Sequence, residues 1–232
     1  MIQIVIPMAG AGSRFSDAGY LTPKPMLDLD GKPMFRRVLE NVISAETSKV
    51  IFITNDRTAL NLNSIQSEYP DIKFFQHKVD SITDGPARTV SLVEYALDMN
   101  LPLVVANSDQ LVAYCISRDY AELGVKCDGI IWCMEDTDPK WSYVALNSDG
   151  YVCDVVEKKV ISNLATVGIY AFANAGDFFS AFKMMVAAED TVNGEYYVAP
   201  VYNYLLSKHR ILPKKHGNHQ RGCIWTWNSN GL

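Results

Sequence analysis

The sequence lacks the features that define several large classes of protein. No apolar run approaches the ~20 residues of a membrane-spanning helix, and no basic start leads into the long apolar core of a secretory signal. Acidic residues outnumber basic ones by 26 to 21, which gives a net charge of −5, whereas a nucleic-acid surface would need a basic stripe. These absences predict a cytoplasmic protein with neither a membrane nor a nucleic acid as partner.

Cysteine is also sparse and unpatterned. The five cysteines are odd in number and form no Cys-x-x-Cys pair, so reduced thiols are the expected state. With 232 residues, 48% of them hydrophobic, the chain is long enough to bury a sizeable core. We expect residues 1–232 to form one domain.

Apolar stretches alternate with helical patterns along the first half of the chain. This alternation predicts an α/β fold with a Rossmann-like, mostly parallel sheet flanked by helices. The second half has closely spaced strand patterns and a hairpin turn at 147–150, which predict an antiparallel insertion. The expected strands are 2–7, 50–54, 72–76, 103–106, 129–134, 143–146, 151–157, 165–173 and one beginning at 211; the expected helices are 34–43, 60–69, 85–97, 176–188 and 195–208, the last interrupted by Pro200.

The first 26 residues are the most informative part of the chain. The apolar run 2–7 leads directly into a loop with Gly10 and Gly12. Glycine lets a backbone turn and approach closely, so that its N–H groups can point at phosphate oxygens. Arg14 and Lys24 would supply positive charge, and the prolines on both sides of Lys24 stiffen the backbone that carries it. The segment predicts a nucleoside triphosphate as substrate; a Gly-rich turn after an edge strand is the simpler alternative.

Two related phosphate-binding motifs do not fit this loop. A dinucleotide fingerprint would need a third glycine where Phe15 stands. A P-loop would need serine or threonine after Gly31-Lys32, where the sequence has Pro33.

Later segments extend the pattern. Asn107-Ser108-Asp109-Gln110 follows an apolar strand, and Trp141-Ser142-Tyr143-Val144 opens a later one. With these motifs the chain resembles the nucleotidyltransferases that join a nucleotide to a phosphorylated sugar or a similar small phosphate and release pyrophosphate. The resemblance covers about residues 2 to 210, and it looks closest to the branch associated with capsule and surface-polysaccharide synthesis.

The resemblance implies a catalytic and nucleotide-binding set. Arg14, Lys24 and Asp109 would be the catalytic residues, and the segment 80–87 would line the base pocket; a capped helix start is the alternative for that segment. Enzymes that use UTP, CTP, dTTP or GTP share this scaffold, so the sequence does not identify the base of the nucleotide. The nucleotide-binding residues would be Ala9, Gly10, Ala11, Gly12, Ser13, Thr83 and Gly85.

Nucleotidyl transfer brings two anions together, so we expect a divalent ion, Mg²⁺, held by few carboxylates and the substrate's phosphates. Asp109 lies at the carboxyl end of a predicted strand, where ligands bind in open α/β sheets. Its position alone fits a helix N-cap as well as a metal ligand, and the resemblance favours the metal. Members of the family often add a second carboxylate near the C-terminus; the comparable stretch here has Asn228 and no acid, so the second ligand stays open.

The acceptor side is predicted around Glu157 and Lys158. A lysine can grip the acceptor phosphate while a carboxylate accepts from a hydroxyl, although such a pair is often a solvated ion pair. By resemblance Gly168 and Glu195 contact the acceptor, and Tyr143 belongs to an aromatic wall, a role that competes with burial in the core.

The expected partners are therefore an NTP and a phosphorylated acceptor, most readily a sugar 1-phosphate; a homo-oligomer is an option that the sequence leaves open. The alternatives are a cytidylyltransferase for a non-sugar phosphate such as phosphocholine and a non-catalytic nucleotide sensor. A glycosyltransferase is disfavoured because it would usually carry Asp-x-Asp, which Asn107-Ser108-Asp109 does not supply.

Overall fold

The computed structural model describes residues 1–10, 12, 19, 21–215 and 225–226. Four positions of the sequence-based predictions, Ala11, Ser13, Arg14 and Asn228, lie outside the described residues.

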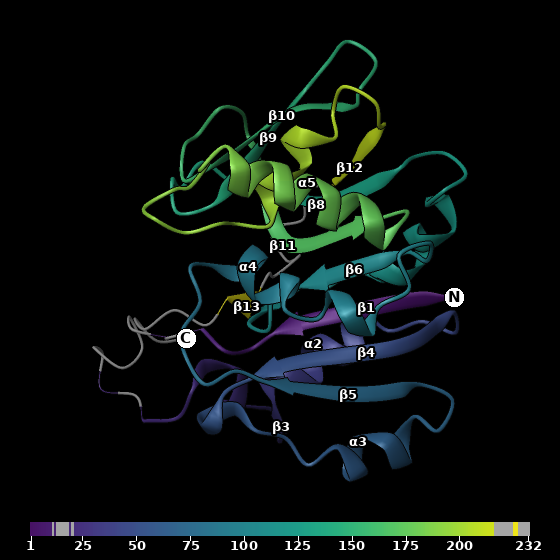
Figure 1. The fold of residues 1–232 in the computed structure, drawn as a ribbon, viewed down its shortest axis with the longest axis vertical. Helices are drawn as coiled ribbons and strands as arrows, with labels where there is room; N and C mark the ends of the chain where they lie inside the picture. Colours follow the sequence, from purple (N-terminus) through teal and green to yellow (C-terminus); the bar gives the residue numbers. More distant parts are fainter. Residues whose placement is uncertain (11, 13–18, 20, 216–224, 227–232) are drawn as a thin grey trace.

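A nine-stranded sheet runs through the molecule (Figure 1). One half is parallel, in the order β5, β4, β1, β6. β1, β4 and β6 are mostly buried on both faces, which is why they contain continuous apolar runs, whereas the edge strand β5 is largely exposed. β1 lies between β4 and β6 and is therefore not an edge strand. Their bounds are Ile2–Pro7 for β1, Thr47–Thr54 for β4, Lys73–Lys78 for β5 and Leu103–Ala106 for β6.

The other half is built on β11 (Leu164–Phe172), which pairs antiparallel with β6, β8 and β9. β9 and β10 form the predicted hairpin, and β12 adds to β8 in parallel. The bounds are Gly129–Glu135 for β8, Ser142–Leu146 for β9, Val152–Glu157 for β10 and Ile211–Lys215 for β12; the short strands are β2 (Asp28–Leu29) with β3 (Lys32–Pro33) and β7 (Gln110–Leu111) with β13 (Trp225–Thr226). The prediction of a mostly parallel α/β sheet with an antiparallel insertion is confirmed.

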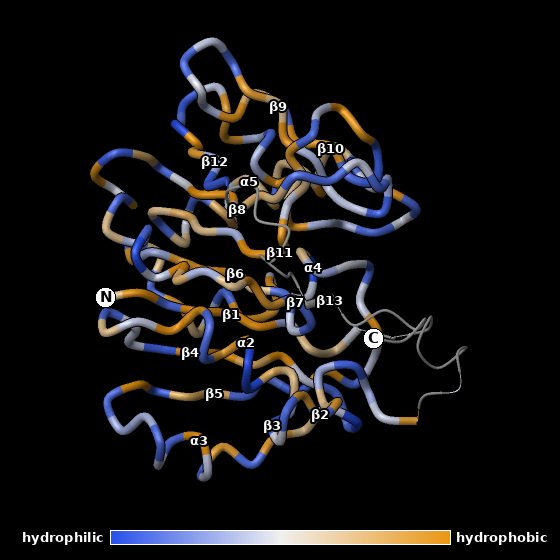
Figure 2. The backbone as a smooth tube through the Cα atoms, turned by 180° about the vertical axis from the view of Figure 1, so that it is seen from behind, coloured by the Kyte–Doolittle hydropathy of each residue, from blue (hydrophilic) through white to orange (hydrophobic). Residues whose placement is uncertain are grey.

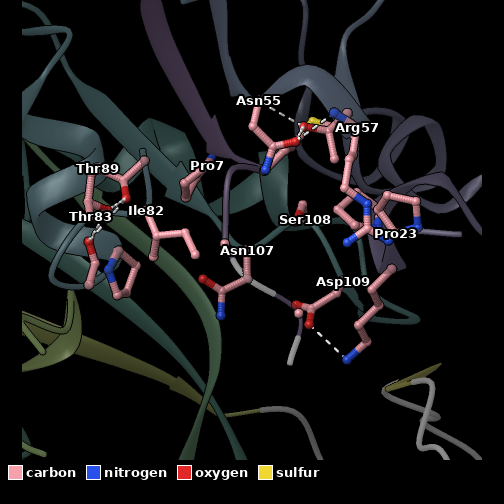
Figure 3. A pocket seen from close by; sticks show the side chains of 18 of the residues that line it. Pro7, Pro23, Asn55, Arg57, Ile82, Thr83, Thr89, Asn107, Ser108 and Asp109 are labelled. Atoms are coloured by element: carbon pink, nitrogen blue, oxygen red, sulfur yellow. Dashed lines mark hydrogen bonds and ion pairs between the residues drawn. The ribbon is translucent and has the colours of Figure 1, made fainter. Parts of the chain in front are cut away.

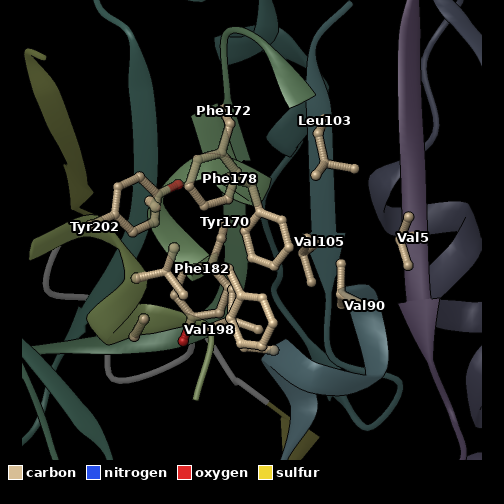
Figure 4. Close-up of a cluster of buried hydrophobic side chains, with 14 of the residues drawn as sticks. Val5, Val90, Leu103, Val105, Tyr170, Phe172, Phe178, Phe182, Val198 and Tyr202 are labelled. Atoms are coloured by element: carbon tan, nitrogen blue, oxygen red, sulfur yellow. The ribbon is translucent and has the colours of Figure 1, made fainter. Parts of the chain in front are cut away.

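Helices cover both faces of the sheet. Buried residues form two clusters, one on each side; in the cluster of Figure 4 the Phe172 ring stacks on Tyr202 with centroids 4.4 Å apart. Along the backbone, apolar stretches coincide with the strands and polar ones with the connections (Figure 2). The α-helices are α2 (Met34–Val42), α3 (Leu62–Glu68), α4 (Pro86–Ser91) and α5 (Ala175–Ala187); the 3₁₀ helices are η1 (Lys24–Met26), η2 (Asp56–Thr58), η3 (Glu94–Ala96), η4 (Ile116–Glu122) and η5 (Ala199–Tyr204).

Two helix predictions are wrong in part. The helix expected over 85–97 ends at Ser91, and a separate 3₁₀ turn follows. The helix expected over 195–208 is the short η5, because the backbone at Tyr196 is used elsewhere: its N–H donates to Asp84 O (2.7 Å) and its carbonyl accepts from Ala87 N (2.9 Å). Tertiary pairing has overridden local helical preference.

None of the helices in the described ranges is long and apolar enough to cross a membrane.

Candidate active site

Two adjoining cavities open at the carboxyl ends of β1 and β6. The first has a volume of about 320 Å³ and the second about 340 Å³. Both are lined by Lys24, Pro86, Asn107 and Asp109, so these residues form the boundary between them. Such a position, outside the carboxyl ends of parallel strands, is where ligands bind in open α/β sheets.

Lys24 and Asp109 meet at this boundary. Lys24 Nζ lies 2.8 Å from Asp109 Oδ2, and the two side chains are 21% and 31% exposed (Figure 3). Lys24 begins η1, between two prolines that restrict the backbone. Asp109 is followed by the strand β7 and not by a helix, so the alternative reading as a helix N-cap is wrong. Two side chains of opposite charge thus form an ion pair where the two cavities join.

The Gly-rich loop lines the first cavity through Gly10 and Gly12. Ala9, which was predicted to bind the nucleotide, is 5% exposed within the core, and its carbonyl accepts a hydrogen bond from Asn55 Nδ2 (3.3 Å). Its side chain does not line the cavity. The side chain of Ala9 therefore belongs to the core.

Thr83 and Gly85 also line the first cavity. The Thr83 hydroxyl is 2.5 Å from that of Thr89 (Figure 3). Gly85 has φ +114°, and a Cβ there would stand 2.5 Å from the backbone N and O of Tyr196. Glycine is required at this point because a neighbouring backbone passes too closely for any side chain.

The second cavity contains a buried acid. Glu157 is 8% exposed and accepts a hydrogen bond from the Ser142 hydroxyl. Burial raises the pKa of the Glu157 carboxyl above its ordinary value, while the bond from Ser142 and the nearby charge of Lys158 act in the opposite direction. Since a buried polar group needs partners, a carboxylate facing this cavity is suited to accept from a ligand hydroxyl.

Lys158 follows Glu157 and lines the same cavity. Its φ of +56° is unusual for a residue with a side chain. Its ammonium donates to the Tyr197 hydroxyl and lies 4.4 Å from the centroid of the Tyr197 ring. The Tyr197 hydroxyl in turn donates to Glu195.

Gly168 lies in an irregularity of β11, where the pairing with β8 shifts register. Its φ is +72°, and a Cβ there would be 1.6 Å from Gln110 Oε1 and 2.3 Å from Asn107 Nδ2. These two amides bond to each other (2.9 Å), and Gly168 O accepts from Asn107 N (2.9 Å). Because Gly168 has no side chain, there is room for the side-chain amides of Asn107 and Gln110, which stand on either side of Asp109 in the sequence.

Two acceptor-side predictions need correction. The Tyr143 side chain is fully buried, its hydroxyl donates to Asp138 O (2.7 Å), and it lines neither cavity. Side chains alternate along β9, so Ser142 faces the second cavity and Tyr143 the other side. Glu195 lines the first cavity and not the second, and its carboxylate accepts a hydrogen bond from the Tyr197 hydroxyl.

Several lining residues were missed by sequence reasoning. Arg57, in η2 after β4, lines the first cavity and donates to Leu21 O (2.8 Å). Its place at the carboxyl end of a predicted strand was a usable signal. Tyr197, in the segment 195–208 for which the helix prediction is wrong, lines the second cavity. Other missed lining residues are Asn55, Thr58 and Thr89 in the first cavity and Lys140 and Thr166 in the second.

Within the described residues no group of three or more His, Cys, Asp or Glu side chains could hold a metal ion by itself. At the cavity boundary Asp109 is the carboxylate, with the Asn107 amide nearby in the same lining.

The two joined cavities lie at the carboxyl edge of the parallel strands of an α/β sheet, with Lys24 and Asp109 at their boundary. The family model described as "Nucleotidyl transferase" matches residues 4–195. The chain therefore belongs to the nucleotidyl transferase family, and the prediction of a nucleotidyltransferase is confirmed.

Individual relatives agree with this assignment. The chain is 22% identical over 219 residues to a UTP–glucose-1-phosphate uridylyltransferase, AglF, of Haloferax volcanii, covering 91% of this chain and 86% of the relative. It resembles the crystal structure of a nucleoside-diphosphate-sugar pyrophosphorylase from Vibrio cholerae RC9, with 27% identity, a TM-score of 0.74 and coverage of 94% and 93%. A UDP-glucose pyrophosphorylase complexed with UDP-glucose shares the fold at 20% identity, with a TM-score of 0.74 and coverage of 94% and 91%.

Proposed function

We propose that this nucleotidyltransferase couples an NTP to a sugar 1-phosphate and releases pyrophosphate. The observation that carries the proposal is the Lys24–Asp109 pair at the boundary of two cavities that open at the same edge of the sheet. One cavity is lined by the Gly-rich loop and the other by a buried acid, hydroxyls and lysines. This is the arrangement that two phosphate-bearing substrates need if their phosphates are to meet.

In this reaction an acceptor phosphate oxygen attacks the α-phosphorus, the bond to the β-phosphate oxygen breaks, and pyrophosphate leaves. The protein contributes positioning and charge neutralisation, because no protein nucleophile is required. We assign the nucleotide to the first cavity. Lys24 would leave Asp109 and bind phosphate oxygens, and Arg14, two positions after Gly12 in the sequence, would add a second cation. Backbone N–H groups at Gly10 and Gly12 would orient the phosphates.

A Mg²⁺ ion fits the residues present. Mg²⁺ prefers oxygen ligands and is commonly held by one or two carboxylates together with substrate phosphates. The Asp109 carboxylate would hold it, and the ion would neutralise charge on the phosphates as it develops. The partial exposure of Asp109 leaves it reachable from both cavities.

The second cavity suits a polyol phosphate better than phosphocholine. Ser142, Glu157 and Thr166 offer hydroxyl and carboxylate groups to sugar hydroxyls, and Lys158 offers a cation to the phosphate. Lys140 and Lys158 would both repel the quaternary ammonium of choline. The uridylyltransferase and pyrophosphorylase relatives point in the same direction.

We further propose that residues 1–232 act as one cytoplasmic domain and that the product serves surface-polysaccharide synthesis. The support is the continuous sheet beneath both cavities and the likeness of segments 107–110 and 141–144 to that branch of the family.

The test is to incubate the protein with each NTP, Mg²⁺ and a panel of sugar 1-phosphates and phosphocholine, and to measure pyrophosphate. Release that requires a sugar 1-phosphate supports the proposal. Release with phosphocholine alone would replace it with the cytidylyltransferase alternative, and nucleotide binding without turnover across the panel would favour a sensor.

A further inference from the structure

Tyr197 connects the two cavities through a chain of hydrogen bonds. Its hydroxyl accepts from Lys158 Nζ on the second-cavity side and donates to Glu195, which lines the first cavity. A phenol can do both at once because its oxygen carries one proton and two lone pairs. Both bonds involve a charged group, and such bonds are stronger than neutral ones.

The geometry fixes Lys158 in one orientation. A lysine side chain normally has several flexible torsions, and ordering it costs conformational entropy. Here the ammonium is held both by the Tyr197 hydroxyl and by the ring, whose centroid is 4.4 Å away. The backbone of Lys158 lies at φ +56°, and its N–H donates to Trp141 O (2.9 Å). A non-glycine residue held in this region indicates that the surrounding structure imposes the conformation.

We propose that Tyr197 is a positioning residue that aims the Lys158 ammonium at the phosphate of the acceptor, with Glu195 orienting the phenol. The inference rests on the proposed function in assigning the acceptor to the second cavity. A pre-aimed ammonium binds an anion without the entropy cost of ordering a free lysine. Tyr197 therefore acts on acceptor affinity and leaves nucleotide affinity unchanged.

The experiment uses Tyr197→Phe, which removes the hydroxyl and keeps the ring. We expect the acceptor KM to rise about tenfold, the loss typical of one hydrogen bond to a charged group, with the NTP KM and the thermal midpoint unchanged. The single variant Glu195→Gln, whose side-chain carbonyl can still accept a hydrogen bond from the Tyr197 hydroxyl, should keep an acceptor KM close to that of wild type. Tyr204→Phe is the matched control, because Tyr204 donates to Asp190 (3.0 Å) and lines neither cavity.

Titration with inorganic phosphate separates this inference from the proposed function, because it needs no turnover. Phosphate binding that Lys158→Ala abolishes and Tyr197→Phe weakens about tenfold supports the positioning role even if no sugar phosphate is turned over. Equal phosphate affinity in wild type and Tyr197→Phe, or the absence of binding that depends on Lys158, would overturn it. A parallel rise in both KM values with a fall in thermal midpoint would show that Tyr197 is merely structural.

Discussion

Lys24 and Asp109 form an ion pair at the boundary of the two cavities, and this contact is the centre of the proposed chemistry. Both side chains are partly exposed, and ion pairs of this kind contribute about 0–1 kcal/mol to stability. The pair is therefore weak enough for polyphosphate and Mg²⁺ to separate it. Residues with a small role in stability can in this way have a large role in activity.

Replacing Lys24 tests that distinction. We expect Lys24→Ala to lower turnover on the order of 10²–10³-fold, because a fixed group that stabilises developing charge is lost. The thermal midpoint should change little. Lys32→Ala is the control, since Lys32 pairs with Glu40 (2.5 Å) and lines neither cavity. Pyrophosphate release is the measurement, and near-normal turnover would remove Lys24 from the mechanism.

Glu157 makes a prediction about pH. Burial raises its pKa above the ordinary value of 4.5, so its stabilising contribution is complete below that value and is lost as pH rises through the folded-state pKa. Glu157→Gln cannot ionise. The unfolding free energy of the variant minus that of wild type should therefore be larger at pH 7 than at pH 4. Urea unfolding at the two pH values measures this difference.

The matched control for this measurement is Glu94→Gln, because Glu94 lies on the surface and pairs with Lys183. If the difference in unfolding free energy between Glu157→Gln and wild type is the same at pH 4 and pH 7, ionisation of Glu157 does not cost stability.

Among the secondary-structure elements, β11 has the most demanding role. It joins the parallel and antiparallel halves of the sheet and interrupts its own pairing at Gly168 to accommodate the amides of Asn107 and Gln110. The irregularity occurs beside the segment that carries Asp109. Bulges of this kind recur near active sites, where they redirect side chains.

Gly168→Ala should cost about 3 kcal/mol of unfolding free energy, because the left-handed backbone is strained and the new methyl group overlaps Gln110. Gly150→Ala is matched to it, with φ +82° and nothing within 4 Å of the added Cβ, and should cost only about 1 kcal/mol. Urea unfolding of both variants gives the comparison. Equal losses would mean that the contact with Gln110 is easily relieved.

The whole molecule places two cavities on one sheet and lets them share four residues. Binding to the folded state alone stabilises a protein by about 2.7 kcal/mol when the ligand is at 100 times its Kd. For a chain of this size, that corresponds to a rise of about 5–10 °C in the thermal midpoint. We expect the correct NTP to produce such a shift with Mg²⁺ and a smaller one with EDTA.

Asp109→Asn should abolish the part of this shift that depends on Mg²⁺, because the carboxylate is lost. Asp149→Asn, in the exposed turn between β9 and β10, should keep it. A shift in Asp109→Asn that still depends fully on Mg²⁺ would place the ion elsewhere.

The sequence by itself determined the α/β class, the strand that enters the Gly-rich loop, and the positions of Lys24, Asp109, Glu157 and Lys158 around the site. The α/β class and the strand before the Gly-rich loop follow from local patterns, because apolar runs mark buried strands, whereas the family resemblance was needed to assign Asp109, Glu157 and Lys158 to the site. Only the tertiary structure decided that Tyr143 turns into the core, that Glu195 faces the first cavity and that Tyr197 holds Lys158. The side that a strand residue faces depends on pairing with distant segments, and the backbone at Tyr196 is not helical because it bonds to residues 84–87. Interactions between residues about a hundred positions apart leave no periodic signal in either segment alone.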